Sequence, residues 1–581
     1  MLREFRTLAP YFRRYLYRYL LGLLCLVLAD GGQLYIPQLV SRAVDLIASG
    51  AFSLGGILAL SGQMIASALV IVGSRFGWRY FIQGSARRIE LGLRQELFYH
   101  LQTLSSTFYG RAKTGDLMSH FTNDMDAIRM ACGMAIVSFV DGVFMTLAIL
   151  VILVSRNPVL TLLSISPLPL ITAGVIAFGK AVGERFLKVQ EGFSKLSEMA
   201  QESISGIRVL KTFVQEKAFV QRFTAANTDY SERNMDLVRL WGFFYPLVAF
   251  LGGLTSMIFL FLGGGAVIDG RLSPGQFTAF FSYLGMLIWP MLGAGFTINI
   301  LQRAGASLGR VNRILEEKPD IASPPGASRA KIRGAVSIRN LSYTYPGSSQ
   351  PVLSGIQLEI PAGSSLGFLG RTASGKSTLA RLLPRVLDPP PGTVFIDGRD
   401  VRSLDLATLR QSIGMVPQDS FLFSATIREN IAFGSRDVGE RVRRAAQIST
   451  IDRDWAGFPL GWDTVVGERG ITLSGGQKQR VALSRALATD AALYIMDDSF
   501  SAVDTETEDA ILRQMLPYLR GRTLILISHR ISTLKMAERI VVLEGGRIAQ
   551  QGSHEELLAQ EGFYAEIYAL QQLEETLERK G

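Results

Sequence analysis

Cysteine and histidine are scarce in this sequence, which contains two cysteines and four histidines in 581 residues. Both cysteines, Cys25 and Cys132, lie inside apolar segments. A disulfide framework needs several paired cysteines, and a structural metal site needs clustered Cys or His ligands. The sequence therefore excludes a small disulfide-stapled protein and gives no indication of a zinc-type site.

Several other signals are missing. No basic stripe interleaves with aromatic residues, so the net charge of +10 does not indicate a nucleic-acid partner. The N-terminus lacks the short apolar region and small-residue cleavage site of a secretory signal. The sequence shows no low-complexity segment and no short-period repeat. A basic balance is instead typical of a membrane protein, in which Lys and Arg gather in the cytoplasmic loops.

Long apolar runs are concentrated before about residue 305, in a chain that is 48% hydrophobic overall. A bilayer is crossed by roughly 20 apolar residues. Six runs of that kind lie at about 19–43, 55–80, 131–154, 158–179, 243–268 and 276–300. Long polar stretches with a helical pattern separate the second run from the third and the fourth from the fifth. We therefore predict six membrane helices with long extensions.

Positive charge orients these helices. Lys and Arg are abundant in both long gaps, whereas the three short gaps contain only Arg156 and Arg271. The positive-inside rule places both long gaps and both termini in the cytoplasm. Residues 1–18 form a basic amphipathic stretch suited to a membrane surface. We expect a multi-pass protein of the cell (plasma or inner) membrane, surrounded by membrane lipids.

A Pro- and Gly-rich run at 322–328 cannot continue a helix and marks a domain boundary. The predicted fold is an α-helical membrane domain fused to an α/β P-loop domain. Its predicted parts are the membrane domain at 1–315 with two cytoplasmic loops, a linker at 316–333 and the α/β domain at 334–581.

The second domain contains a phosphate-binding motif. Residues 370–377 match GxxxxGK[ST], between an apolar strand at 365–369 and a helical segment that starts at Thr378. Glycines let backbone N–H groups point at phosphate oxygens, Lys376 reaches the β- and γ-phosphates, and the Ser377 hydroxyl binds Mg²⁺. The predicted nucleotide-binding residues of this loop are Gly370, Arg371, Thr372, Ala373, Ser374, Gly375, Lys376, Ser377 and Thr378.

Further motifs follow in order and at matching spacing. They are Tyr345 after a strand, Gln418 in Val416-Pro417-Gln418, the run Leu473-Ser474-Gly475-Gly476-Gln477, Asp497 at the end of an apolar strand, Ser501-Ala502-Val503-Asp504, and His529 in Ser528-His529-Arg530. With these motifs the chain resembles ABC exporters over essentially its whole length. Residues 464–470 resemble the exporter-specific segment before the signature. Residues 114–117 with Asn123-Asp124, and residues 206–211, resemble the two coupling regions of that class.

The resemblance implies a role for each motif residue. It implies ATP and Mg²⁺ as cofactors, with Tyr345 stacking on adenine. It implies Ser377, Gln418 and Asp497 as metal ligands, and Gln418 and His529 as catalytic residues beside position 498. It also implies that Ser474, Gly475, Gly476 and Gln477 contact the ATP held by a second exporter half. ATP-dependent export of a drug, lipid or peptide by alternating access is the function it implies.

One position departs from the family pattern. The family places a catalytic glutamate after the Walker B aspartate, and this chain has Asp498 there. Aspartate is one methylene shorter, which sets its carboxylate back by roughly 1.5 Å and can cost about 10²-fold in rate. The signature at 473–477 is intact, a combination that resembles the degenerate half of a heterodimeric exporter whose partner supplies the glutamate. A homodimer that turns over slowly with Asp498 is the alternative.

Three rival functions and one open question remain at this point. Six membrane segments argue against a soluble ABC ATPase, and the retained Lys376 argues against a gated channel or regulatory subunit. An importer of metal-chelate complexes on the same scaffold stays open. Asp30 and Asp141 lie in apolar segments one and three. Each is either functional, as intramembrane carboxylates often are, or a residue near a water-filled vestibule or helix end.

Overall fold

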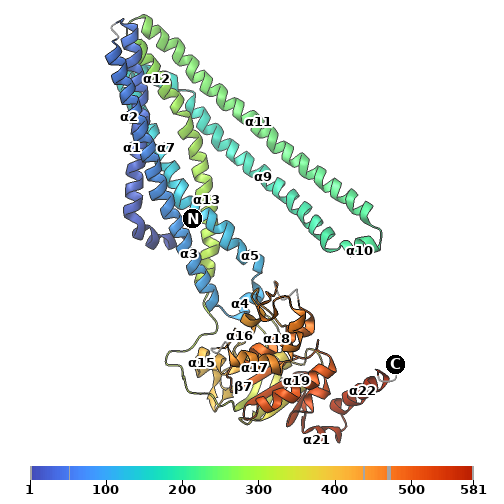
Figure 1. Cartoon of the computed structure of the whole chain (residues 1–581). Helices are drawn as coiled ribbons and strands as arrows, with labels where there is room; N and C mark the ends of the chain where they lie inside the picture. The colour runs from blue at the N-terminus through green and yellow to red at the C-terminus, as the bar shows by residue number, and fades with distance from the viewer. Residues whose placement is uncertain (1–2, 51–52, 436–438, 468–472, 579–581) are drawn as a thin grey trace. The chain divides into compact units, whose positions relative to one another are not determined.

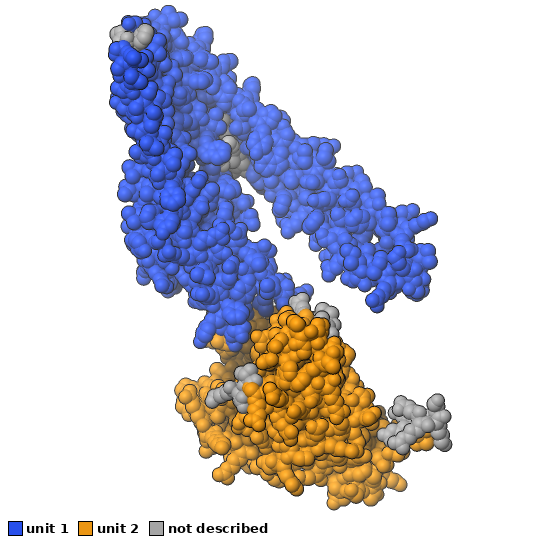
Figure 2. Space-filling view, in the orientation of Figure 1, with its two compact units in different colours: residues 1–102, 113–317 blue, residues 103–112, 318–581 orange. Residues whose placement is uncertain are grey.

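The computed structural model describes the chain except for residues 1–2, 51–52, 436–438, 468–472 and 579–581. The described chain forms two compact units (Figure 2). The first contains residues 1–102 and 113–317, and the second contains residues 103–112 and 318–581. A short segment of the N-terminal half, 103–112, thus belongs to the C-terminal unit. The predicted domain limits at 315 and 334 did not include this assignment.

The first unit consists of helices. They are η1 (Glu4–Leu8), α1 (Ala9–Ala48), α2 (Leu54–Trp78), η2 (Arg79–Gln83), α3 (Gly84–Thr103), α5 (Thr114–Ser119), η3 (His120–Asp124), α6 (Met125–Met130), η4 (Ala131–Ala135), α7 (Ile136–Arg156), α8 (Pro158–Ile165), α9 (Leu168–Ser205), α10 (Ile207–Thr212), α11 (Glu216–Ile268), α12 (Pro274–Met286) and α13 (Ile288–Glu316). Helices α1, α2 and α12 pack together, and α7 packs on α13. Helices α9 and α11 run side by side and are joined through α10 (Figure 1).

Five helical stretches of the described residues are long and apolar enough to cross a membrane. They are Glu4–Ala48, Leu54–Thr103, Thr114–Arg156, Glu216–Ile268 and Pro274–Glu316. The fourth predicted segment, 158–179, is divided between α8, which ends at Ile165, and α9, which begins at Leu168. Pro167 lies at this break, because proline lacks a backbone N–H and its ring clashes with the preceding turn. The expected segment is therefore built from two helices.

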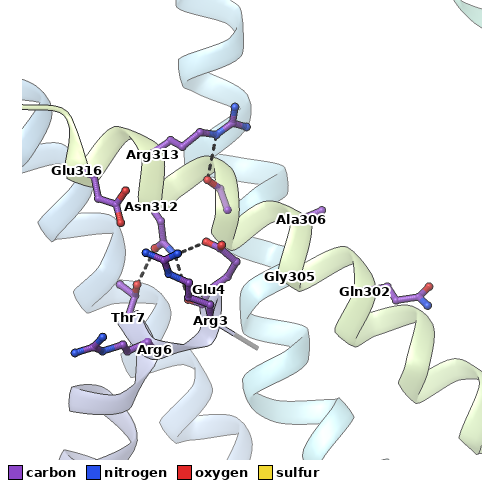
Figure 3. A pocket seen from close by; sticks show the side chains of 11 residues that line it. Arg3, Glu4, Arg6, Thr7, Gln302, Gly305, Ala306, Asn312, Arg313 and Glu316 are labelled. Carbon is purple, nitrogen blue, oxygen red and sulfur yellow. Dashed lines mark hydrogen bonds between the residues drawn. The ribbon is translucent and has the colours of Figure 1, made fainter. Parts of the chain in front are cut away.

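Polar side chains fix the ends of the first unit's helices. Asp124, which is 4% exposed, accepts hydrogen bonds from Ser307 Oγ at 2.8 Å and Arg310 Nε at 3.0 Å, and so joins η3 to α13. Near the N-terminus, Thr7 Oγ1 donates to Asn312 Oδ1 at 2.8 Å (Figure 3). Asn312 Nδ2 in turn donates to the backbone oxygen of Glu4 at 3.1 Å. These contacts hold η1 against α13 at the edge of an open pocket that both elements line.

The second unit contains two sheets. The strands are β1 (Val336–Tyr343), β2 (Leu353–Ile360), β3 (Ser365–Gly370), β4 (Val394–Ile396), β5 (Arg399–Asp400), β6 (Ile413–Val416), β7 (Leu493–Asp497), β8 (Thr523–Ile527), β9 (Arg539–Glu544) and β10 (Arg547–Gly552). The smaller sheet is antiparallel, in the order β2-β1-β4-β5. The larger has the order β10-β9-β3-β8-β7-β6, and every pair is parallel except β10 with β9. Strands β3, β7 and β8 are buried almost throughout, as expected where helices cover both faces of a parallel sheet.

Helices surround these sheets. They are α4 (Ser106–Arg111), α14 (Lys376–Leu382), α15 (Leu406–Gln411), α16 (Ile427–Ala432), α17 (Glu440–Ile448), α18 (Gly475–Leu487), α19 (Thr505–Tyr518), α20 (Ile531–Leu534), α21 (His554–Leu558) and α22 (Phe563–Glu578). Helix α4 comes from the first long gap between membrane segments. Ser106 Oγ donates to the backbone oxygen of Val386 at 2.6 Å, and Ser105 Oγ donates to Asp320 Oδ2 at 3.1 Å. Residues 103–112, which belong to the second unit, therefore lie just before residues 114–117, the segment that resembles a coupling region.

Tyr494 anchors β7, the strand that ends at Asp497. Its side chain is fully buried, its hydroxyl donates to Thr489 O at 2.7 Å and it accepts from Arg522 Nη1 at 2.8 Å. We expect Tyr494→Phe to destabilise the second unit by about 1–3 kcal/mol, because the buried hydroxyl and its two half-buried partners lose their hydrogen bonds. The measurement is the unfolding transition of that unit in calorimetry of the full chain. Tyr568→Phe, whose ring packs on His554, is the control, and an equal loss in both variants would contradict the account.

Candidate nucleotide-binding site

The site is built at one edge of the larger sheet. Strands β3, β6, β7 and β8 are parallel, so their carboxyl ends meet at the same edge. The phosphate loop follows β3, Gln418 follows β6, Asp497 ends β7 and His529 follows β8. Ligands of open α/β sheets bind in the crevice outside such strand ends. The topology therefore brings four motifs together that are far apart in the sequence.

Close packing fixes the shape of the phosphate loop. Gly375 has φ +98°, and a Cβ there would lie 2.5 Å from Leu353 Cδ2. A Cβ on Gly370 would lie 2.3 Å from the backbone oxygen of Leu543. Lys376 is 6% exposed, and its Nζ donates to the backbone oxygens of Gly370 at 2.7 Å and Arg371 at 2.9 Å. The ammonium group is thus held inside the loop that would surround the phosphates.

Burial controls the charge of this lysine. Burial lowers the pKa of Lys376 from its ordinary value, while the neighbouring carboxylates of Asp497 and Asp498 act in the opposite direction. A phosphate group would place further negative charge next to the ammonium and favour its charged form. The residue type and the position both fit an anion-binding role for Lys376.

The end of β7 offers a place for a hard cation. Ser377 Oγ donates to Asp497 Oδ1 at 3.1 Å. Asp497 is 1% exposed, and its Oδ2 has no hydrogen-bond partner among the described atoms. Burial raises the pKa of Asp497, and the hydrogen bond from Ser377 opposes that shift. An unpartnered buried carboxylate oxygen beside a hydroxyl fits Mg²⁺, which prefers oxygen ligands and would neutralise phosphate charge there.

Asp498 is held by its backbone rather than by its side chain. Its φ is +51°, and its N–H donates to the backbone oxygen of Ile527 at 2.9 Å. This bond joins the end of β7 to the end of β8. The bond fixes the main chain from which the side chain starts, and an aspartate side chain is one methylene shorter than that of glutamate. The carboxylate stays short of the position a glutamate would reach.

The signature motif forms the start of α18. Ser474 is its N-cap, and Ser474 and Gln477 form a reciprocal capping box with N···O distances of 3.2 and 3.0 Å. Ser474 and Gly475 are exposed. Within the described residues, no hydrogen bond joins residues 474–477 to the phosphate loop of the same chain. The start of the motif is therefore fixed by the capping box and open to solvent.

The buried Gln479 connects the signature helix to residues 501 and 502 through hydrogen bonds. Gln479, 6% exposed, donates to Ser501 Oγ at 2.8 Å and accepts from Ala502 N at 2.9 Å. A Cβ on Gly476 would lie 2.8 Å from the backbone oxygen of Ala502. Glycine at position 476 thus allows the signature helix to approach this loop closely.

The loop after β8 is tied to the same region. Arg530 Nη1 donates to Val503 O at 3.0 Å and pairs with the buried carboxylate of Glu508 in α19. Gln571 in α22 donates to the backbone oxygen of His529 at 2.8 Å and accepts from Ile531 N at 2.9 Å. The His529 side chain itself is exposed. The sequence alone did not indicate four residues that position these loops, because no local pattern shows which distant loop a side chain will bond to. They are Gln479, Arg530, Glu508 and Gln571.

The remaining motif residues lie around this edge. Tyr345 follows β1, and its hydroxyl is 3.1 Å from Thr378 Oγ1 in α14, which orients the ring beside the phosphate loop. Gln418 is exposed in the loop after β6, one strand away from Asp497. Of the exporter-specific segment 464–470, Val466 N donates to Ala425 O at 2.9 Å, and residues 468–470 lie outside the described residues.

Comparisons with known proteins identify the family. Models for "ABC transporter transmembrane region" and "ABC transporter" match residues 19–291 and 353–501. The probable multidrug resistance ABC transporter ATP-binding/permease protein YheI of Bacillus subtilis is 36% identical over 99% of this chain and 98% of its own length. The chain belongs to the ABC transporter family. The multidrug resistance-like ATP-binding protein MdlA of Escherichia coli is also 36% identical, over 99% of this chain and 98% of that protein.

Other comparisons define the type of ABC transporter. The ATP-dependent lipid A-core flippase of Syntrophus aciditrophicus is 35% identical over 84% of this chain and 81% of that protein. A solved bacterial Atm1-family ABC exporter with ATP bound has a TM-score of 0.80 at 28% identity, covering 96% of this chain and 99% of that structure. The chain is an ATP-driven ABC exporter with several membrane-spanning helices. The predicted fold class, the ATPase activity and the binding of ATP are confirmed.

We expect Lys376→Ala to weaken ATP binding at the chain's own phosphate loop by about tenfold to a hundredfold, since charge-assisted hydrogen bonds contribute about 1.5–3 kcal/mol. Nucleotide affinity of the full-length protein, measured with a fluorescent ATP analogue, tests this. Lys331→Ala changes an exposed lysine outside the loop and serves as the control. Unchanged affinity in Lys376→Ala would contradict the assigned role.

Proposed function

We propose that this chain is one half of a heterodimeric exporter that moves a hydrophobic or amphipathic substrate out of the cell by alternating access. The observation that carries the proposal is the pairing of Asp498 with an intact, ordered signature at 474–477. On this proposal the partner is a different ABC exporter half that has glutamate after its Walker B aspartate. On this proposal the membrane domain covers 1–315, the linker 316–333 and the nucleotide-binding domain 334–581, with residues 103–112 of the first belonging to the second compact unit. The nucleotide-binding domain and both termini lie in the cytoplasm.

Each chain contributes to two composite sites. At one site Lys376, Ser377, Asp497, Gln418 and Tyr345 bind ATP with Mg²⁺, and Asp498 and His529 face the γ-phosphate. Hydrolysis there is slow because the backbone bond from Asp498 to Ile527 leaves the short carboxylate set back. At the other site, the exposed Ser474 hydroxyl faces ATP on the partner's phosphate loop.

ATP at a composite site touches both chains, so it stabilises the closed dimer more than the open one. Helix α10 supports the role of the second long loop in this movement. Its tip exposes apolar side chains at the end of the paired helices α9 and α11; among them are Ile207 (45% exposed), Val209 (60%) and Phe213 (68%). Exposed apolar residues in such a cluster are typical of a contact with another protein surface.

Comparing the ATPase rates of two variants tests whether the site with Asp498 is the one that hydrolyses ATP slowly. In the assembled transporter we expect Asp498→Asn to change the ATPase rate less than about threefold, because little catalysis is lost there. Ser474→Ala should lower the rate by about tenfold or more, since a hydrogen bond to phosphate at the competent site disappears. Ser553→Ala removes a matching capping box from α21 and controls for lost helix capping. If Asp498→Asn abolishes activity while Ser474→Ala is mild, the chain works as a homodimer with Asp498 as its base.

Transport in inside-out membrane vesicles tests the export function. With ATP outside, we expect accumulation of a neutral hydrophobic dye or inward movement of a fluorescently labelled phospholipid. Vesicles with Ser474→Ala in this chain should show about a tenfold lower rate, in parallel with the ATPase rate. ATP-dependent loss of a metal-chelate complex from the vesicles, without export of either probe, would support the importer alternative and contradict the proposal.

A further inference from the structure

A cavity of the membrane unit is lined by residues of α1, α2, η2, η4, α7 and α13. Its volume is about 570 Å³, within the usual range of about 300–1,000 Å³ for sites that take a drug-sized molecule. Trp78 of α2 and Trp289 and Phe296 of α13 line it, so its walls contain aromatic side chains. Asp30 of α1 and Asp141 of α7 also line it. The cavity thus combines apolar walls with two acidic groups.

The two carboxyl groups adjoin each other, although they come from different helices. Asp30 is 4% exposed, and its Oδ2 has no hydrogen-bond partner among the described atoms. A carboxylate buried in an apolar surrounding costs several kcal/mol unless a cation or a hydrogen-bond donor compensates for the lost water. A second carboxyl group next to it increases that cost. The pair therefore favours the arrival of positive charge in the cavity.

Two arginines line the cavity as well, and each is engaged with another group. Arg75 Nη2 donates to Gln33 Oε1 at 3.0 Å. The guanidinium of Arg79 lies 5.5 Å from the ring centroid of Trp78. Both arginine side chains are exposed, whereas Asp30 is buried. Within the described residues, neither arginine makes an ion pair with Asp30 or Asp141. The charge of Arg75 acts on Asp30, but neither carboxyl group has a salt-bridge partner among the described residues.

We propose that this cavity binds a hydrophobic organic monocation, with the cationic centre at Asp30 and Asp141 and its apolar groups against Trp78, Trp289 and Phe296. Aromatic faces attract a cation through their quadrupole, and the carboxylates provide the opposite charge. Asp30 and Asp141 are specificity-determining residues of this site. The inference rests on the proposed export function, for which it names the substrate class.

A pair of probes with the same shape and opposite charge tests the site. Tetraphenylphosphonium is the cation and tetraphenylborate the anion. Binding of each is measured on the full-length assembled transporter in lipid nanodiscs, with empty nanodiscs as the background. We expect saturable binding of tetraphenylphosphonium and an affinity for tetraphenylborate at least about tenfold weaker. Equal affinity for both ions would overturn the proposal.

Substitutions locate the binding to the acidic pair. Asp141→Asn and Asp30→Asn should each weaken tetraphenylphosphonium binding by about tenfold. Each should also reduce the ratio of the affinity for tetraphenylphosphonium to the affinity for tetraphenylborate. Asp269→Asn removes an exposed carboxylate at the end of α11, outside the cavity, and should leave binding unchanged. Asp141 is less buried than Asp30, so its variant decides the outcome if Asp30→Asn does not fold, as judged by ATP affinity and gel filtration. Wild-type affinity in Asp141→Asn would overturn the proposal.

The binding test and the vesicle test fail independently. A transporter that moves the neutral dye or the lipid, but does not distinguish the two ions, overturns the cation site and leaves the export function in place. Charge-selective binding that depends on Asp141, without ATP-driven movement of the dye, the lipid or tetraphenylphosphonium into the vesicles, supports the site and contradicts the export function.

Discussion

The buried carboxylate of Asp497 is the group around which the nucleotide site is arranged. It is 1% exposed, it accepts a hydrogen bond from Ser377, and its charge favours the charged form of the buried Lys376. Charged groups in such a setting need partners, because burial removes the water that would otherwise stabilise them. The parallel order of β3, β8 and β7 brings these partners together at one sheet edge. The phosphate loop, Ser377 and Asp498 all lie at that edge.

The loops around this edge are joined to one another. Gln479 holds residues 501 and 502 to the signature helix, and Arg530 holds Val503 and Glu508 to the loop that carries His529. Gln571 fixes the same loop from α22. Residues beside the chain's own phosphate loop are thus connected through short bonds to the signature, which the proposed function places against a partner's ATP. On that proposal, this connection gives a physical route by which one composite site influences the other.

The membrane unit follows different rules, because lipid replaces water around it. Its buried polar groups are paired across helices in several places: Tyr283 OH donates to Leu34 O at 2.6 Å, and Asp45 accepts from Gly275 N at 2.8 Å. Asp30 departs from this pattern, since one of its oxygens has no partner. In a low-dielectric setting an unsatisfied carboxylate is costly unless function retains it. That contrast is the reason for assigning a ligand to the cavity.

The sequence by itself determined the features that depend on neighbours in the chain. Apolar runs of membrane length, the backbone curl of the phosphate loop and the missing methylene at Asp498 are local, so spacing and residue type were enough to predict them. Contacts between distant segments were decided only by the tertiary structure. The break at Pro167, the placement of α4 in the second unit, the hold of Gln571 on the His529 loop and the meeting of Asp30 with Asp141 all belong to this group. Helix packing and strand register set such contacts, and no periodicity within one element shows which residue of another element it will meet.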